Sequence, residues 1–370
     1  MDGEIQMISV LHTESSTGWG GQENRTLKES IGLKKLGARV VILCQPGSMI
    51  GKIAAAEGLE VKTCRMRKHY DLPAISSIMK LIVSENIDVI STHSGRDSFL
   101  AGAAGRVSRR QPAIVRTRHL ALPITSRFTY SVLPHKVVTT SEYVRRYLIS
   151  AGIGPERVVT VHTGIDLSRF DPDNTPALLR QELGLGAGVP VFGTVSILRI
   201  KKGHQILLEA IPMVLEKIPD AVFVIAGDGP QRENIANQIK KSGLSGKVFM
   251  LDLRQDIPAI LNSIDIFVLP TLQEAHGGVF VEAMAMRKPV IGTDVGGVGE
   301  VIKHGINGFL IEPGNAKALA DAMMEMLGNR EGMAAMGDEG RKMVEEHFSA
   351  EKMCDSMYAL YTSLLNGRGW

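Results

Sequence analysis

The sequence has few cysteines and no long apolar run. Among its 370 residues, Cys44, Cys64 and Cys354 are the only cysteines. Their odd number and the lack of any CxxC spacing argue against a disulfide framework and against a zinc site. No apolar run reaches the ~18 residues that a membrane-spanning helix needs. The segment 1–10 is too short and too acidic for a secretory signal. These absences predict a protein that stays in the cytoplasm.

Several motifs of ligand-binding enzymes are also missing. The glycine-rich turn at Gly18–Glu23 does not have the G-x-G-x-x-G spacing, and Cys44-Gln45-Pro46 stands where a dinucleotide-binding protein has an acidic residue. Asp171-Pro-Asp173 has the Asp-x-Asp spacing but lies in a turn-rich segment, so we expect no metal site. Neither a Ser-His-Asp set nor an adjacent carboxylate pair suggests a nucleophile and its base.

Length and charge distribution bound the organisation of the chain. Because a single core stops growing at ~250 to 300 residues, this length predicts two domains. Residues 1–170 carry 23 Lys and Arg against 14 Asp and Glu, whereas residues 171–370 carry 19 against 25. The basic first half favours an anionic partner, such as acidic lipid headgroups or a phosphorylated saccharide, over nucleic acid. Solvated surface charge is the alternative explanation.

Short β-branched runs alternate with helical stretches along the whole chain. The expected strands of the first half are Ile5–Leu11, Val40–Cys44, Val89–Thr92, Ile114–Thr117, Val137–Thr140 and Val158–Val161. Those of the second half are Val189–Val195, Ala221–Ala226, Val248–Leu251, Ile266–Leu269, Pro289–Gly292 and Gly308–Ile311. Strands that alternate with amphipathic helices indicate parallel α/β sheets. The Gly-, Asp- and Pro-rich segment 164–176 marks a boundary between them.

This pattern predicts an α/β protein with two Rossmann-like, doubly wound domains that face a cleft. The first domain is expected at residues 1–170 and the second at 171–350. Residues 351–370 are expected to form a last helix that packs back on the first domain.

Three glycine-containing segments follow expected strands, where parallel sheets bind ligands. They are Gly18–Glu23, Ala226–Pro230 and Glu274–Glu282. In the third, Gly277 and Gly278 open a helix whose first amides and positive dipole end suit a diphosphate. Glu282 lies about one turn further on, within reach of a ribose diol, and Glu274 would face a reacting sugar. Plain turns and a solvated helix face are the alternatives that need no ligand.

Seven pieces of the chain resemble glycosyltransferase family 4, the retaining GT-B transferases, in order and spacing. They are Gly20-Gly21-Gln22-Glu23, Val115–His119, Gly164–Phe170, Lys202-Gly203-His204, Gly227–Pro230, Glu274–Glu282 and Gly292–Gly297. The resemblance covers nearly the whole length and implies the GT-B fold.

The resemblance also implies roles for the matching residues. Lys202 would neutralise the leaving diphosphate, Glu274 would bind donor sugar hydroxyls, and His119 would lie near the anomeric carbon. Glu282 would bind the nucleotide ribose. The other implied donor-binding positions are Gly21, Gly229, Arg254, His276, Gly277, Gly278, Val279 and Phe280. A front-face substitution, in which the departing phosphate helps to deprotonate the acceptor, is the mechanism proposed for this family.

Two departures from the family pattern concern the phosphate and the sugar. Ile197 stands where the family has an arginine, five residues before Lys202, and Ser196 replaces the usual glycine. Arg199 is the candidate substitute for that arginine. His276 stands where an aromatic residue is common, so this position is the first to examine for sugar choice.

His93 and His119 follow strand ends in the first half of the chain, where functional groups of α/β proteins concentrate. Beside His93, Arg96 and Asp97 offer a cation and a carboxylate that would face the acceptor. Alternatively, Asp97 caps the helix that follows, and the histidines are structural.

We therefore expect a retaining, metal-independent hexosyltransferase that needs no cofactor besides a nucleoside-diphosphate sugar. The expected acceptor is a saccharide or glycolipid of lipopolysaccharide or other envelope synthesis, with the protein peripheral at the inner membrane. Alternatives are a non-catalytic nucleotide-sugar binding protein, a GT-B epimerase or phosphorylase, and a nicotinamide dehydrogenase. The sequence leaves the base, the sugar, the acceptor and the oligomeric state open.

Overall fold

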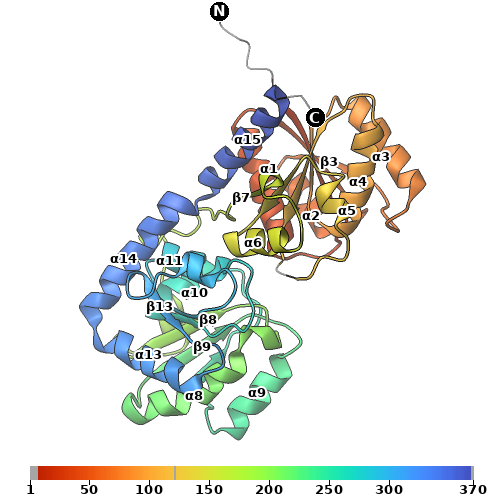
Figure 1. Ribbon diagram of the computed structural model, residues 1–370. Helices are drawn as coiled ribbons and strands as arrows, with labels where there is room; N and C mark the ends of the chain where they lie inside the picture. Colours follow the sequence, from red (N-terminus) through yellow and green to blue (C-terminus); the bar gives the residue numbers. More distant parts are fainter. Residues whose placement is uncertain (1–6, 121, 368–370) are drawn as a thin grey trace, which may run out of the picture. The chain divides into compact units, whose positions relative to one another are not determined.

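The computed structural model describes residues 7–120 and 122–367, and it divides into two compact units (Figure 1). Unit 1 comprises Met1–Gly164 and Ala350–Trp370, and unit 2 comprises Ile165–Ser349. Each unit is a parallel sheet with helices around it, so the fold class expected from the sequence is confirmed.

Unit 1 contains a seven-stranded sheet in the order β3-β2-β1-β4-β5-β6-β7. The strands are β1 (Ser9–Glu14), β2 (Arg39–Cys44), β3 (Glu60–Thr63), β4 (Val89–Thr92), β5 (Ala113–Arg118), β6 (Lys136–Thr139) and β7 (Val158–Thr160). The helices are α1 (Gly21–Lys35), α2 (Met49–Ala56), α3 (Leu72–Ser84), α4 (Gly95–Val107), α5 (Phe128–Ser131), α6 (Glu142–Ser150), η1 (Pro155–Arg157) and α15 (Ala350–Asn366). The order of strands reverses between β1 and β4, which is where such sheets bind ligands.

Unit 2 contains a six-stranded sheet in the order β10-β9-β8-β11-β12-β13. The strands are β8 (Val191–Val195), β9 (Val222–Ala226), β10 (Val248–Met250), β11 (Ile266–Leu269), β12 (Val290–Thr293) and β13 (Gly308–Ile311). The helices are α7 (Leu179–Glu182), η2 (Ile200–Lys202), α8 (His204–Lys217), α9 (Arg232–Lys241), α10 (Ile257–Ser263), α11 (Gly278–Ala285), α12 (Val298–Val301), α13 (Ala316–Gly328) and α14 (Arg330–His347). Here the strand order reverses between β8 and β11.

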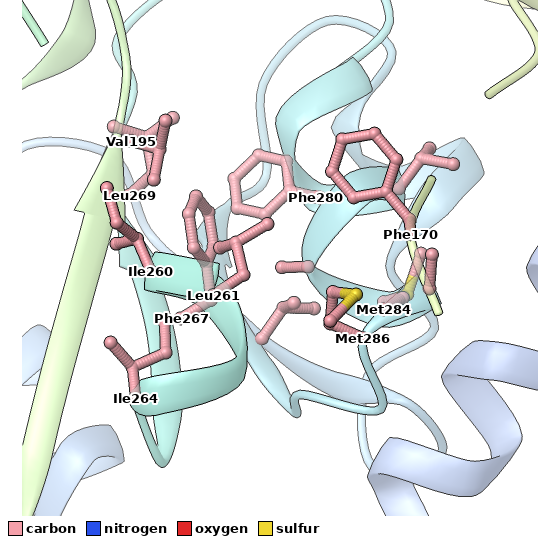
Figure 2. Packing of buried hydrophobic residues seen from close by; sticks show 14 of the residues in the cluster. Phe170, Val195, Ile260, Leu261, Ile264, Phe267, Leu269, Phe280, Met284 and Met286 are labelled. Atoms are coloured by element: carbon pink, nitrogen blue, oxygen red, sulfur yellow. The ribbon is translucent and has the colours of Figure 1, made fainter. Parts of the chain in front are cut away.

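The sheet of unit 2 is buried on both faces. In β11, Phe267 and Leu269 belong to one hydrophobic cluster, while Ile266 and Val268 belong to the cluster on the opposite face. Figure 2 shows Phe267 and Leu269 among the residues of the first cluster, next to Phe280 of α11. Successive side chains of a strand point to opposite faces, so an uninterrupted apolar run is what a doubly covered strand requires.

The boundary between the units differs from the expected one by a few residues. The sequence placed residues 165–170 with the first domain, but Ile165 and Phe170 are buried in the core of unit 2. The backbone N–H of Ile165 donates to the carbonyl of Phe348, 2.9 Å away, which fixes this segment to the end of α14. The glycine- and aspartate-rich composition indicated a turn, but it could not show which core the two apolar residues join.

Two strands of unit 1 also differ from expectation. The first strand was expected at Ile5–Leu11, of which Ile5 and Gln6 lie outside the described residues, and the structure continues β1 through His12, Thr13 and Glu14. These polar side chains are fully buried, so the polar residues did not mark the strand end. The edge strand β3 was not expected, because Glu60–Thr63 is short and only partly buried.

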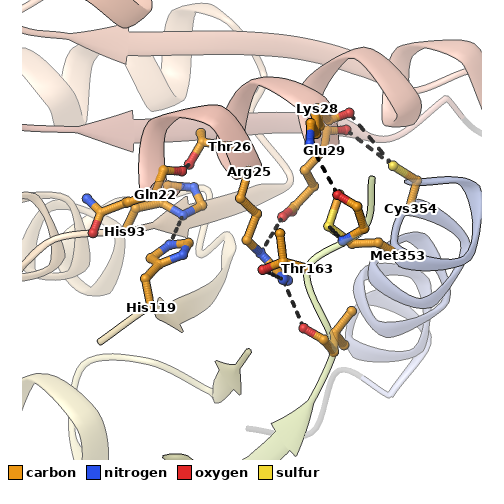
Figure 3. Close-up of polar contacts among 12 residues, drawn as sticks. Gln22, Arg25, Thr26, Lys28, Glu29, His93, His119, Thr163, Met353 and Cys354 are labelled. Carbon is orange, nitrogen blue, oxygen red and sulfur yellow. Dashed lines mark hydrogen bonds and ion pairs between the residues drawn. The ribbon is translucent and has the colours of Figure 1, made fainter. Parts of the chain in front are cut away.

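The last helix was expected to pack back on the first domain, and α15 lies in unit 1 against α1. Its Cys354 Sγ lies 3.8 Å from the carbonyl oxygen of Lys28 (Figure 3). Within the described part of the chain, no helix is both long and apolar enough to cross a membrane.

Candidate active site

An ion pair between Lys202 and Glu274 lies at the strand-order reversal of unit 2. Lys202 ends η2, which follows β8, and Glu274 follows β11, the neighbouring strand. The ammonium group of Lys202 donates to Oε2 of Glu274 over 2.5 Å, and Oε1 accepts from the backbone N–H of Ala275 at 3.1 Å. The side chains are only 14% and 17% exposed, so both charges are fixed in place and largely shielded from bulk water.

Close backbone packing holds the loops that carry this pair. Gly203 adopts a left-handed conformation with φ of 73°, and a Cβ there would lie 1.8 Å from the carbonyl oxygen of Pro270. Gly296, with φ of 58°, approaches the carbonyl of Glu274 as closely. The loops after β8, β11 and β12 can touch in this way because both positions lack a side chain.

Helix α11 begins beside Glu274 with the left-handed residue Gly277 at its N-cap. Gly278 and Val279 are partly exposed, and their first-turn amides have no acceptor within the helix. The amide of Phe280 instead donates to the carbonyl of Gly277 at 2.9 Å, and its ring is fully buried, 5.5 Å from that of Phe267. The side chain of Phe280 therefore belongs to the core, and donor binding by residues 277–280 stays a prediction. Glu282, on the same helix, is partly exposed.

Two further residues expected to bind the donor, Gly229 and Arg254, lie after strands of the same sheet. Gly229 follows β9, and its amide donates to Oδ1 of Asp228 at 2.7 Å. Arg254 binds the carboxylates of Glu182 and Asp256, each at 2.7 Å. Its predicted place beside the base stays a prediction.

Two other positions of unit 2 bear on the departures from the family pattern. The exposed side chain of Arg199 makes no hydrogen bond or ion pair with the described residues. The buried ring of His276 lies 5.6 Å from that of Phe348. The side chain of Arg199 is thus available for a phosphate, whereas the ring of His276 packs against Phe348.

Unit 1 gathers several predicted residues at its own strand-order reversal. Gly21 opens α1 after β1, and a Cβ there would meet no atom within 4 Å. Asp97, at the start of α4, is fully buried and accepts hydrogen bonds from the amides of His93 and Ser94. Asp97 therefore caps the helix, the alternative that the sequence left open. Arg96 donates to the carbonyl of Met66 at 2.8 Å.

Three histidine side chains form a continuous chain in unit 1. Nδ1 of His93 lies 3.2 Å from Nε2 of His119, and Nε2 of His93 lies 3.0 Å from Nδ1 of His12. Figure 3 shows the contact between His93 and His119, close to Arg25 of α1. Burial lowers the pKa of all three imidazoles, so each ring is neutral at pH 7.

Sequence reasoning missed several buried polar residues of unit 1. They are His12 and Glu14 of β1, Arg25 and Glu29 of α1, and Tyr361 of α15. Polar residues inside an apolar strand, at His12 and Glu14, were the available signal. The sequence contains no sign that Tyr361 reaches Glu29, since the two are 332 positions apart.

Comparison with known proteins agrees with this arrangement. A family model described as Glycosyltransferase Family 4 matches residues 19–169, and one described as Glycosyl transferases group 1 matches residues 177–343. The chain is a family 4 glycosyltransferase. The first match lies mainly in unit 1 and the second lies in unit 2 of the glycosyltransferase.

The relatives of this glycosyltransferase include proteins named as a synthase and as a galactosyltransferase. N-acetyl-alpha-D-glucosaminyl L-malate synthase of Bacillus anthracis is 27% identical, over 86% of this chain and 78% of the relative. UDP-Gal:alpha-D-GlcNAc-diphosphoundecaprenol alpha-1,3-galactosyltransferase of Escherichia coli is also 27% identical, over 80% of each chain.

Solved structures show the same fold. A glycosyltransferase from Rickettsia africae superposes with a TM-score of 0.90 at 24% identity, over 98% of this chain and all of the other. HepE of Anabaena, in complex with UDP and glucose, superposes with a TM-score of 0.83 at 21% identity, over 96% and 100%.

Proposed function

We propose that this glycosyltransferase transfers a hexose-like unit from a nucleoside-diphosphate sugar with retention at the anomeric carbon. The observation that carries the proposal is the Lys202–Glu274 ion pair beside the N-terminus of α11. A cation and free amides suit a diphosphate, and a carboxylate suits sugar hydroxyls. Both kinds of group therefore occur within one site, as a sugar nucleotide requires.

The arrangement favours electrostatic catalysis over covalent catalysis. The ammonium of Lys202 and the amides of Gly278 and Val279 would stabilise the charge that develops on the leaving diphosphate. Oε1 of Glu274 is held by the amide of Ala275 and Oε2 by Lys202, so this carboxylate orients the cation as well as the sugar. A front-face substitution needs no protein nucleophile, and the departing phosphate would accept the proton of the acceptor hydroxyl.

The names of similar proteins support a nucleoside-diphosphate sugar as the donor and a saccharide or glycolipid as the acceptor. The Escherichia coli relative is named for UDP-Gal and for a diphosphoundecaprenol acceptor, and the Anabaena structure holds UDP and glucose. We propose by analogy that this enzyme takes a nucleoside-diphosphate sugar and glycosylates a lipid-linked or other saccharide precursor of the cell envelope. We also propose that it acts in the cytoplasm, where its free cysteines remain reduced.

An aromatic patch on unit 1 supports a peripheral membrane location. It is formed by Tyr70, Phe99 and Phe128. The centre of the Phe99 ring lies 4.9 Å from that of Tyr70 and 6.2 Å from that of Phe128. Tyr70 is 79% and Phe128 45% exposed. Exposed cationic residues lie close to Tyr70 and Phe128 in the sequence, namely Arg65, Arg67, Lys68 and Arg127. Amphipathic aromatic rings beside cations suit the surface of an anionic membrane.

Metal independence is a further proposal. Both carboxylates of the Asp171-Pro-Asp173 segment already have partners. Asp171 accepts a hydrogen bond from the amide of Asp173, and Asp173 forms an ion pair with Arg287 at 3.0 Å. Full activity in excess EDTA is the expected result.

Two measurements test the proposed reaction. A thermal-shift screen against UDP-, GDP- and ADP-sugars should find one donor, because a ligand at 100 times its dissociation constant adds ~2.7 kcal/mol of stability. Proton NMR of the product should then show the anomeric configuration of the donor. Slow donor hydrolysis without acceptor would separate the enzyme from a non-catalytic binding protein, which would show none. An inverted product would refute retention.

A further inference from the structure

The histidine chain ends on a buried acidic group of α1. Nε2 of His12 lies 3.9 Å from Oε1 of Glu29, and the same oxygen accepts a hydrogen bond from the hydroxyl of Tyr361 at 2.8 Å. The other carboxylate oxygen of Glu29 lies 3.9 Å from Nε of Arg25. His12, Glu29 and Tyr361 are all fully buried, so no bulk water reaches this end of the chain.

A row of neutral imidazoles has only two consistent arrangements of its protons. Each neutral ring carries one N–H and one lone pair, and each N···N hydrogen bond needs one of each. Either every ring is protonated on Nε2, so that His119 donates to His93 and His93 to His12, or every ring is protonated on Nδ1, and the donors are reversed.

The charge of Glu29 decides between these two arrangements. With the rings protonated on Nε2, the proton of His12 lies on the nitrogen 3.9 Å from Oε1 of Glu29, where the negative charge stabilises it without a direct hydrogen bond. In the reversed arrangement, the lone pair of Nε2 would face that carboxylate, which is unfavourable in a buried, low-dielectric environment. Arg25 approaches the other oxygen of Glu29 through Nε, and its Nη1 donates to the carbonyl of Val161 at 2.9 Å and to the hydroxyl of Thr163 at 3.0 Å, so Oε1 remains the oxygen nearest His12.

We propose that Glu29, through His12 and His93, fixes His119 as the Nε2–H tautomer, so that Nδ1 of His119 accepts a hydrogen bond from a substrate hydroxyl. His119 is partly exposed, and its Nδ1 makes no hydrogen bond to the residues that the structure describes. A ring nitrogen that carries only a lone pair can bind a hydroxyl but cannot donate to a phosphate oxygen.

In this proposal the positioning residues are Glu29, His12 and His93. The ring of His119 then accepts a hydrogen bond from a hydroxyl of the sugar. This second step rests on the proposed placement of His119 beside the donor sugar, whereas the tautomer does not. The hydroxyl of Tyr361 on α15 donates to the same carboxylate, so the C-terminal helix helps to hold Glu29 in place.

The tautomers can be measured directly in the full-length protein without substrate. Long-range proton–nitrogen NMR of ¹⁵N-histidine-labelled protein distinguishes protonated from unprotonated ring nitrogens. We expect Nε2–H for His12, His93 and His119 in the unaltered protein. A predominantly Nδ1-protonated His119 would overturn the proposal, whatever the enzyme transfers.

Substitutions at the end of the chain provide the second test. In Glu29→Gln the amide can donate to His12, so His119 should lose its single tautomer. The turnover number should fall about fivefold to tenfold, the value of one hydrogen bond, with a smaller change in the KM of the donor. Tyr361→Phe keeps the carboxylate and should keep the tautomer, and Glu57→Gln is the matched exposed control. A folded Glu29→Gln protein with an unchanged His119 tautomer would overturn the proposal.

The double variant separates positioning from a loss of structure. If Glu29 acts through His119, then Glu29→Gln should cost nothing further in a His119→Ala background. An equal additional loss of turnover in that background would contradict the proposed path.

Discussion

Lys202 and Glu274 are 72 positions apart in the sequence, yet their charged groups meet at 2.5 Å. The contact exists because β8 and β11 are neighbours in the sheet and their carboxyl ends point to the same edge. One group suits a phosphate and the other a sugar, so the proposed site would bind both parts of a donor molecule. The roles of its members can be separated by substitution.

Glu274→Ala should leave nucleotide affinity within about threefold, because removing a carboxylate beside Lys202 does not remove any group that binds phosphate. Turnover should fall at least about a hundredfold, the scale of losing an oriented catalytic group. Glu282→Ala should instead weaken nucleotide binding. Isothermal titration with UDP and GDP, together with turnover, measures both. Equal loss of nucleotide affinity in the two variants would refute this division of roles.

Lys202→Met removes the charge but keeps much of the length of the side chain, so diphosphate binding and turnover should both fall. Lys202→Arg keeps the cation and should retain more of the binding than of the turnover, because a guanidinium cannot occupy the same point as an ammonium. Titration with the nucleoside diphosphate and with the corresponding nucleoside provides the control. A drop in nucleoside affinity as large as that for the diphosphate would show that the lysine does not act on the phosphates.

Gly278→Ala tests whether α11 receives a ligand. A Cβ at this position meets no atom within 4 Å, and alanine in a helix is favoured over glycine by up to about 1 kcal/mol. The variant should therefore be as stable as the unaltered protein or more stable, and yet bind the donor more weakly. Gly203→Ala is the contrasting variant, since its Cβ would collide with the carbonyl of Pro270 and lower the melting temperature. Unchanged donor affinity in Gly278→Ala would argue against a ligand at this helix start.

Glu14 should make stability depend on pH. Burial, and then the charge of Asp97, raise the pKa of this fully buried carboxyl to about 8, from 4.5 as the ordinary value. The folded protein thus keeps a proton that the unfolded chain releases, and stability falls as pH rises from about 4.5 to 8.

Glu14→Gln should remove that dependence. Relative to the unaltered protein, the variant should gain up to about 1.4 kcal/mol of stability per pH unit across this window. Urea unfolding at several pH values between 5 and 8 measures the difference, with Glu57→Gln as the control. A difference between variant and unaltered protein that stays constant with pH would show that Glu14 is already ionised in the folded state.

The aromatic patch of Tyr70, Phe99 and Phe128 should bind anionic membranes. Tyr70→Ser combined with Phe128→Ser should reduce flotation with anionic vesicles, because each exposed ring would bury apolar surface at the interface. Ile306→Ser, an exposed apolar residue of unit 2, should have no effect. Equal flotation with neutral and anionic vesicles would contradict an electrostatic contribution from the neighbouring cations.

Much of the proposed donor site could be described from sequence because its parts are local. The turn after a strand, the glycines that open α11, and Glu274 and Glu282 on either side of them lie within nine consecutive positions. Their conformation depends on neighbours in the chain, so the sequence pattern is enough to identify them. The family resemblance added the roles.

The sequence by itself determined two parallel α/β units, because alternating strands and helices have few alternative arrangements. It also indicated which loops carry the proposed donor site. Only the tertiary structure decided that Lys202 pairs with Glu274, that Asp97 is buried in a cap, and that His12, His93 and His119 form a chain leading to Glu29 and Tyr361. These contacts join segments that are distant in the sequence. Buried polar groups need hydrogen-bond partners, and only the tertiary structure shows which groups lie close enough to serve.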